Sequence, residues 1–212
     1  MILAKEAGVF RKLFPQKNIP IILRAVLKAG RTLEKQTPTE WENSLTRRLH
    51  SRLIRIYPFR DGPLSIQLQP EIPSLHQDEE LLSGQIDLLV PSNLGYQIYF
   101  AIEAKRLRYI SPNGKFIPGN SNYVNDGMMR FISGQYAPLV QTGAMLGYVF
   151  DGHIAAARNG INGYIQIKAN ELKIGPPKKL TNSTILIDNA IDKTHHDMED
   201  RLFIIYHVFL SV

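Results

Sequence analysis

Two acids and a lysine stand within one short stretch of this 212-residue chain, at positions where charge is unusual. Asp87 interrupts an apolar run at 85–90, and sixteen residues later Glu103 and Lys105 flank Ala104 in a second apolar run. Charged groups are costly to bury unless they pair with one another or bind a metal ion. Two carboxylates and an ammonium in such places therefore predict a site for a divalent cation held by oxygen ligands.

The chemistry available to such a site is phosphodiester hydrolysis. A divalent cation held by two carboxylates can lower the pKa of a bound water, orient it and neutralise charge that develops on a phosphate. Lys105, partly desolvated beside the metal, could hold or deprotonate the attacking water. Mg²⁺ or Mn²⁺ is the expected metal, because Mg²⁺ is typically bound by a few carboxylates, several waters and substrate oxygens.

Two strands joined by a turn must position these groups. The first spans 85–90, the turn at 91–95 contains Pro, Asn and Gly, and the second strand spans 96–107. Side chains alternate across a strand, so Glu103 and Lys105 share one face. Asp87 then lies beside Glu103 if the register of the hairpin allows it.

The other elements are predicted from periodicity and from turn residues. A helix from Thr37-Pro38 to about residue 57 has an apolar stripe, which consists of Trp41, Leu45, Leu49, Leu53 and Ile56. Before this helix, helices are expected at 2–14 and 19–35, and a break of the second at Gly30 is the alternative. After it, a strand at 64–71 precedes the two site strands. The remaining elements are a loop at 109–122, a helix from 123 or 124 to 141, a strand at 144–150, a helix at 153–169, a linker at 176–179, a strand at 184–187, a polar loop at 191–200 and a strand at 202–212, for which a buried helix is the alternative.

With this order of elements, the chain resembles the PD-(D/E)XK nuclease superfamily, also called the restriction-endonuclease-like fold. The resemblance rests on Gln85-Ile86-Asp87 followed by Glu103-Ala104-Lys105, and it covers residues 38–151. Ile86 stands where the named motif has proline. The resemblance implies an α/β fold with an αβββαβ core, in which helices flank a mixed central sheet and the site lies at one edge.

The resemblance also implies roles for individual residues. Asp87, Glu103 and the backbone carbonyl of Ala104 would be metal ligands, and Lys105 would orient the water or stabilise the transition state. The acid that the first helix often contributes would be Glu42, with Glu40 as the competing choice. Many members carry a Gln or Tyr on the helix after the third strand, a place that Gln135 and the adjacent Tyr136 could fill.

The expected function is therefore that of a Mg²⁺- or Mn²⁺-dependent nuclease acting on DNA, in restriction, defence or mobile-element biology. Endonuclease and exonuclease action both stay open, as does RNA as a substrate. The alternative is a non-catalytic nucleic-acid-binding or assembly module that keeps the fold. Cleavage of both strands of a duplex would call for a homodimer, and target choice could depend on an accessory protein.

Composition and charge set further bounds. The chain has no cysteine, which rules out disulfides and thiolate zinc sites. Residues 1–60 contain 13 Lys and Arg against 4 Glu, a net charge of +9, and the remaining residues carry −3. The basic part is either a solvated helix surface or a phosphate-binding surface. No apolar run approaches the length of a membrane span, so a cytoplasmic protein is expected.

The simplest organisation is one domain over 1–212. It would comprise a basic helical accessory segment at 1–36, the catalytic core at 38–151 and a C-terminal helix with strands at 152–212. Arg106 and Arg108 are expected either to contact phosphate or to be exposed. The histidines at 195–196 are assigned to a polar loop rather than to a metal site, and His207 to the core.

Overall fold

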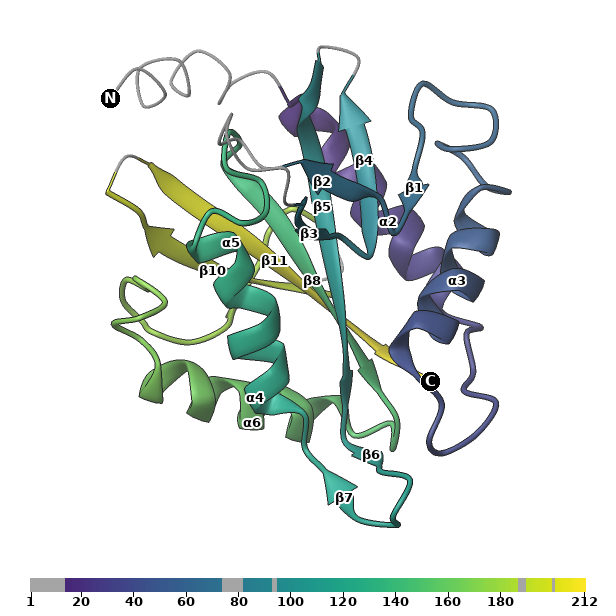
Figure 1. Ribbon diagram of the computed structural model, residues 1–212, viewed down its shortest axis with the longest axis vertical. Helices are drawn as coiled ribbons and strands as arrows, with labels where there is room; N and C mark the ends of the chain where they lie inside the picture. Colours follow the sequence, from purple (N-terminus) through teal and green to yellow (C-terminus); the bar gives the residue numbers. More distant parts are fainter. Residues whose placement is uncertain (1–13, 74–81, 93–94, 187–189, 200) are drawn as a thin grey trace.

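The computed structural model describes residues 14–73, 82–92, 95–186, 190–199 and 201–212, and it centres on a seven-stranded mixed sheet (Figure 1). The strands of this sheet are β1 (Gln67–Leu68), β4 (Leu88–Ser92), β5 (Gly95–Leu107), β8 (Thr142–Val149), β9 (Thr181–Asn182), β10 (Ile191–Asp197) and β11 (Leu202–Ser211). Their spatial order is β1-β4-β5-β8-β11-β10-β9. β8 runs parallel to β5 and to β11, and the other neighbours are antiparallel. The expected α/β class with a mixed central sheet is confirmed.

Helices cover both faces of this sheet (Figure 1). The first face carries α2 (Ile19–Gly30) and α3 (Glu42–Leu53), preceded by the short helix η1 (Gln16–Asn18). The second carries α4 (Asn120–Tyr123), the π-helical turn η2 (Val124–Met128), α5 (Met129–Ile132) and α6 (Ile154–Ile167). On β8, Tyr148 contacts Thr46 of α3, whereas a Cβ on Gly143 would meet Phe131 of α5. Positions of opposite parity face opposite ways, so β8 is buried between two helical layers.

Two small sheets lie outside the central one. β2 (Glu71–Pro73) pairs with β3 (Leu82–Gln85), and β6 (Tyr109–Ile110) pairs with β7 (Phe116–Ile117). The expected strand at 64–71 is therefore wrong, because it is divided between β1 and β2. The expected loop at 109–122 is also wrong, because it contains the β6–β7 hairpin and the start of α4.

The helix predicted from Thr37 to residue 57 is shorter than expected. Residues 37–40 form a turn, α3 begins at Glu42, and Trp41 is 65% exposed instead of belonging to the apolar stripe. The Glu40 carboxylate accepts the backbone N–H of Gln36 at 2.6 Å, which stabilises the turn before the helix. The apolar stripe is confirmed for Leu45, Leu49 and Leu53, which are buried.

The first predicted helices have mixed outcomes. The helix expected at 19–35 ends at Gly30, which confirms the alternative of a break there, and a Cβ on Gly30 would lie 2.4 Å from Leu210 Cδ1 of β11. The helix expected at 2–14 falls outside the described residues except for Phe14. In the described part of the chain, no helix combines the length and the apolar character that crossing a bilayer requires.

The helical segment after β5 also ends earlier than predicted. It runs through α4, η2 and α5 to Ile132, and Gly134 then adopts φ +79°, which stops the helix. Gln135 and Tyr136 therefore follow the helix instead of lying on it, contrary to expectation. The strand at 144–150 and the helix at 153–169 are confirmed as β8 and α6 within about two residues.

The last part of the chain contains the largest error of the sequence-based assignment. Residues 191–197 form β10 rather than a polar loop. The predicted strand at 184–187 is wrong, because residues 184–186 form a turn after β9, and residue 187 lies outside the described part. β10 can be buried because its polar side chains have internal partners. Asp192, which is 2% exposed, forms a salt bridge with Arg158 of α6. The final strand is confirmed as β11.

A chain of hydrogen bonds between buried groups joins α4 to β11 and β10. The Tyr123 hydroxyl lies 2.9 Å from His207 Nδ1, Thr194 Oγ1 lies 2.9 Å from His207 Nε2 and 2.7 Å from His196 Nε2, and His196 Nδ1 lies 2.7 Å from the Leu172 carbonyl. That carbonyl can only accept, so neutral His196 donates from Nδ1 and accepts the Thr194 hydroxyl proton at Nε2. Thr194 then accepts from His207 Nε2–H, and Tyr123 donates to His207 Nδ1. Both histidines are thus fixed in one neutral tautomer, which confirms His207 as a core residue.

Glycine is required where the chain returns from the β6–β7 hairpin to α4. Gly119 adopts φ +76°, and a Cβ there would lie 2.3 Å from the carbonyl oxygen of Arg106. Gly114, at the hairpin turn, has a similar φ of +78°, but a Cβ there would meet no atom within 4 Å. The two positions share a backbone conformation and differ in available space.

We expect Gly119→Ala to reduce the free energy of unfolding by about 3 kcal/mol, because strain at positive φ adds to a clash with backbone. Gly114→Ala carries the conformational strain alone and should cost about 1 kcal/mol. Urea denaturation of both variants measures the difference. Equal losses would show that the close approach of Gly119 to β5 is not as tight as described.

Candidate active site

The site lies where β5 extends past the beginning of β4. Leu88 pairs with Ile102, so β4 starts at that point and residues 103–107 of β5 have no β4 partner. On the other side the same residues pair with β8, from Met145 to Val149. One edge of β5 is therefore available to side chains that come from elsewhere.

Two carboxylates occupy this edge and bind its backbone N–H groups. Asp87 Oδ2 accepts the N–H of Ala104 at 2.8 Å, and Glu42 Oε2 accepts the N–H of Arg106 at 3.2 Å. Within a strand, the N–H and the C=O of one residue point to the same edge. The carbonyl of Ala104 therefore points to the side on which Asp87 binds its N–H. Asp87 stands in a bend directly before β4, not inside a strand as predicted.

The predicted neighbourhood of Asp87 and Glu103 is nevertheless found. Asp87 directly precedes Leu88, the partner of Ile102, and its charge acts on Glu103. Glu103 and Lys105 share a face of β5, and Lys105 Nζ donates to Glu103 Oε1 at 2.6 Å. Lys105 Nζ also lies 3.7 Å from Glu42 Oε1. Glu103 is 1% exposed and Lys105 is 7% exposed, so this ion pair is buried.

Of the two competing helix acids, the structure brings Glu42 to the site and directs Glu40 elsewhere. Glu40 accepts hydrogen bonds from Ser44 and Arg48, in addition to Gln36, and these contacts lower its pKa despite burial. Its function is to fix the turn before α3. Glu42, in the first turn of α3, reaches the open edge of β5.

Arg130 of α5 was not predicted as a site residue. Its guanidinium donates to Glu103 Oε1 at 3.1 Å and also to the Tyr136 hydroxyl, which in turn donates to the Gln85 carbonyl at 2.6 Å. Tyr136 thus reaches the site through Arg130. One signal in the sequence could have identified this residue: Arg130 is the only Lys or Arg between residues 124 and 141.

The side chains of the other candidate residues, Gln135, Arg106 and Arg108, contact protein groups away from the two carboxylates. Gln135 is half-buried, and a Cβ on Gly84 would lie 2.7 Å from its Nε2, so its amide lies beside β3. Arg106 is buried and donates to the carbonyls of residues 39 and 40. Arg108 forms a bidentate pair with Asp151. Neither arginine is a freely exposed side chain, which was one of the two expectations for them.

The buried position of the site disfavours the charged forms of its carboxyl groups and raises their pKa values. Burial and the charge of Asp87 raise the pKa of Glu103 to about 8, against the lowering effect of Lys105 and Arg130. Burial also raises the pKa of Asp87. The pKa of Lys105 is raised too, since Glu103 and Glu42 outweigh the effect of its burial. Cations and protons are therefore favoured between the two carboxyl groups.

The residues present fit a divalent cation. Glu103 Oε2 is buried, and no donor group among the described residues is directed at it. A cation near Asp87 and Glu103 would satisfy this oxygen and offset the burial that raises the pKa of each carboxyl group. The described residues contain no group of three or more His, Cys, Asp or Glu that could hold a metal ion. Two carboxylates and a carbonyl suit Mg²⁺, which retains several waters and also uses substrate oxygens.

Comparisons with protein-family models, with curated proteins and with solved structures found no match to this chain. Its chemistry must therefore be inferred from the residues at the open edge of β5.

Proposed function

We propose that this protein is a metal-dependent nuclease that hydrolyses phosphodiester bonds of DNA. The observation that carries the proposal is the buried set of Asp87, Glu103 and Lys105, in which Glu103 Oε2 has no hydrogen-bond partner among the described residues. Without a ligand, this arrangement is a costly way to stabilise a sheet edge. A reaction that requires a metal ion and a lysine at the same place would explain why these charged groups are buried together.

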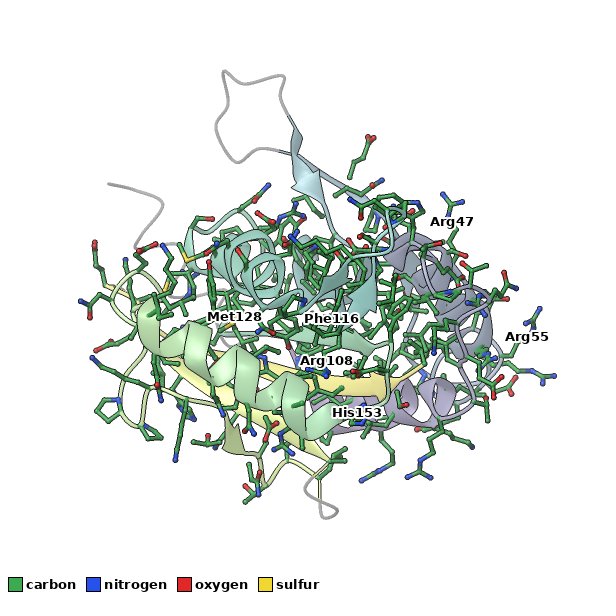
Figure 2. The ribbon with its side chains drawn as sticks, turned by 90° about the horizontal axis from the view of Figure 1, so that it is seen from below. Arg47, Arg55, Arg108, Phe116, Met128 and His153 are labelled. Atoms are coloured by element: carbon green, nitrogen blue, oxygen red, sulfur yellow. The ribbon has the colours of Figure 1, made fainter. Side chains whose placement is uncertain are left out.

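The order of elements supports the same proposal. α3 contributes Glu42, β4 and β5 place Asp87 near Glu103, and α4 to α5 lead to β8, which is parallel to β5. This succession agrees with the αβββαβ core that the restriction-endonuclease-like fold implies. Basic residues on and directly after α3 add a surface for phosphates: Arg47 of α3 and Arg55, two residues beyond its end, extend into solvent (Figure 2).

Each side chain has a distinct part in the proposed reaction. Asp87 and Glu103, with the carbonyl of Ala104, would hold the cation. When bound, Mg²⁺ or Mn²⁺ would supply Lewis-acid stabilisation of the phosphate and a lowered pKa for a coordinated water. Lys105, held by Glu103 and Glu42, is positioned to orient the attacking water or stabilise negative charge on the phosphate. Arg130 restrains Glu103 through the same oxygen, Oε1, which it contacts at 3.1 Å.

The intact trio favours catalysis over the alternative of a non-catalytic binding module. A module that only binds nucleic acid would need neither the second buried carboxylate nor its buried lysine. The two functions differ in a direct assay, because only the nuclease cleaves its ligand when a divalent cation is present.

We expect the purified protein to cleave nucleic acid in Mg²⁺ or Mn²⁺ and to lose that activity in EDTA, with recovery when the cation is restored. Linear, circular and single-stranded DNA and RNA, assayed in parallel, would identify the substrate and separate endonuclease from exonuclease action. Cleavage that is equally fast in EDTA would contradict the proposed metal dependence. If no substrate in this set is cleaved in either cation, the binding module becomes the better account.

A further inference from the structure

The single tryptophan of the chain lies on the surface beside the site. Trp41 directly precedes Glu42 and is 65% exposed, although a large apolar ring gains most from burial. It does not complete the apolar stripe of α3. Its exposed ring therefore calls for an explanation other than packing.

The guanidinium of Arg106 packs against one face of the exposed Trp41 ring and holds it in place. The guanidinium of Arg106 lies 4.5 Å from the centre of the Trp41 ring and 4.1 Å from that of Tyr109. Arg106 cannot easily move, because its Nη1 donates to the Glu40 carbonyl at 3.0 Å and to the Thr39 carbonyl at 3.3 Å. Cation–π contact with a buried arginine fixes the indole while most of its surface stays open.

A short series of contacts connects this ring to the candidate active site. Glu42, the next residue, accepts the N–H of Arg106 through Oε2, and its Oε1 lies 3.7 Å from Lys105 Nζ. The same arginine therefore supports Trp41 through its side chain and Glu42 through its backbone. Trp41 and the proposed catalytic residues belong to one rigid arrangement.

We propose that Trp41 is a stacking platform for an unpaired base, so that the substrate is single-stranded nucleic acid or a single-stranded segment of a larger substrate. The inference rests on the proposed function, since the base would adjoin a phosphate at the site. A fixed, open aromatic ring next to a site for phosphate, as proposed here, is the arrangement that single-strand-binding proteins use, and stacking tolerates every base. A base inside a duplex is already stacked on both faces and cannot use the ring.

The tryptophan itself supplies the test, because its fluorescence reports only on residue 41. In EDTA, where no cleavage is expected, titration with single-stranded DNA and with single-stranded RNA should quench the emission of the parent protein. Blunt duplex DNA of the same length should quench it much less. Quenching by either single strand supports the platform, and the stronger one identifies the sugar. If neither single-stranded DNA nor single-stranded RNA quenches the emission, or if the duplex quenches it equally, the inference is wrong.

Three variants test whether stacking contributes to affinity. Trp41→Ala should weaken binding of the single strand by roughly 5- to 100-fold, as expected for the loss of one stacked base, and Trp41→Phe should recover most of it. Tyr57, which is 63% exposed beyond the opposite end of α3, is the matched control. In a Trp41→Phe, Tyr57→Trp double variant, the new tryptophan should not be quenched. Unchanged affinity in Trp41→Ala would contradict the proposal.

The outcomes separate this inference from the proposed function. Quenching by single strands without any metal-dependent cleavage would support the stacking role of Trp41 and contradict the nuclease activity. Cleavage without preferential quenching would support the nuclease activity and contradict the stacking role.

Discussion

Replacement of Glu103 by Gln is expected to lower metal-dependent cleavage by about 10³-fold or more, equivalent to about 4 kcal/mol of transition-state stabilisation. The amide retains the size of the side chain but removes the negative charge that would hold the cation. It also replaces the charged acceptor of Lys105 Nζ, which lies 2.6 Å from Glu103 Oε1, by a neutral amide oxygen that binds the ammonium more weakly. Asp87→Asn and Lys105→Ala should abolish cleavage in the same way, each through a different part of the site.

The fold should survive the Glu103→Gln substitution. Burial and the charge of Asp87 raise the pKa of Glu103 to about 8, so its surroundings disfavour the charged form when no cation is bound. A neutral amide of the same size therefore costs the fold little. Circular dichroism and thermal melting would check this, and initial cleavage rates under substrate saturation would give the effect on kcat.

Asp192→Asn provides a control matched in burial. Asp192 is 2% exposed and paired with Arg158, but it lies on β10, three strands away from β5 in the sheet. Its substitution should reduce stability and leave cleavage within about threefold of the parent at a temperature where both are folded. If Glu103→Gln and Asp192→Asn reduce cleavage equally, the loss reflects general destabilisation and the site assignment is wrong.

The second large effect concerns acid stability and the buried histidines. Burial lowers the pKa of His196 to about 4, with a smaller contribution from the neighbouring His195, and it lowers the pKa of His207 further below its ordinary value. In the unfolded chain both would titrate near 6.5. The unfolded state therefore binds protons first as the pH falls below about 6.5, and stability is lost from there down to about pH 4.

The carboxyl groups of the site act in the opposite direction. Because the pKa of Glu103 is raised to about 8, the folded state takes up a proton first as the pH falls from 8, and this uptake stabilises it. The measurement must therefore isolate the histidine. The free energy of unfolding of Glu103→Gln is compared with that of Glu103→Gln, His196→Asn at each pH, because contributions from all other groups then cancel.

Between pH 7 and pH 4.5 the difference in unfolding free energy between these two proteins should fall by about 2.5 kcal/mol, in the direction that makes the histidine-containing protein relatively less stable in acid. Asn at 196 keeps a donor for the Leu172 carbonyl but does not titrate. Urea denaturation at several pH values gives the curve. A difference that does not change with pH would mean that His196 is not held neutral by burial.

The sequence predicted the centre of the site because two simple regularities determine it. Alternation along a strand places Glu103 and Lys105 on one face, and a short hairpin between two apolar strands leaves few registers. Asp87 therefore lies near Glu103 even though it belongs to a bend and not to the strand. Local pattern was sufficient for these three residues.

The parts that were missed depend on contacts between distant segments. The turn before α3 is held partly by Arg106, 64 positions beyond Glu42, which donates to the carbonyls of residues 39 and 40. β10 was taken for a loop because its polar residues find partners only in the folded protein, such as Arg158 for Asp192. Arg130 reaches Glu103 only because a π-helical turn and α5 cross that face of β5. Hydrophobic periodicity carries no information on such pairs.

The most direct test of the central claim is a titration of cleavage with Mg²⁺, for the parent and for Glu103→Gln, after both have been freed of metal with EDTA. The account predicts that the parent is inactive without the cation, gains activity in a saturable manner as Mg²⁺ is added, and exceeds the variant by about 10³-fold at saturation. Activity in the absence of divalent cations, or equal rates for the two proteins across the titration, would contradict the assignment of Asp87 and Glu103 as the residues that hold the metal.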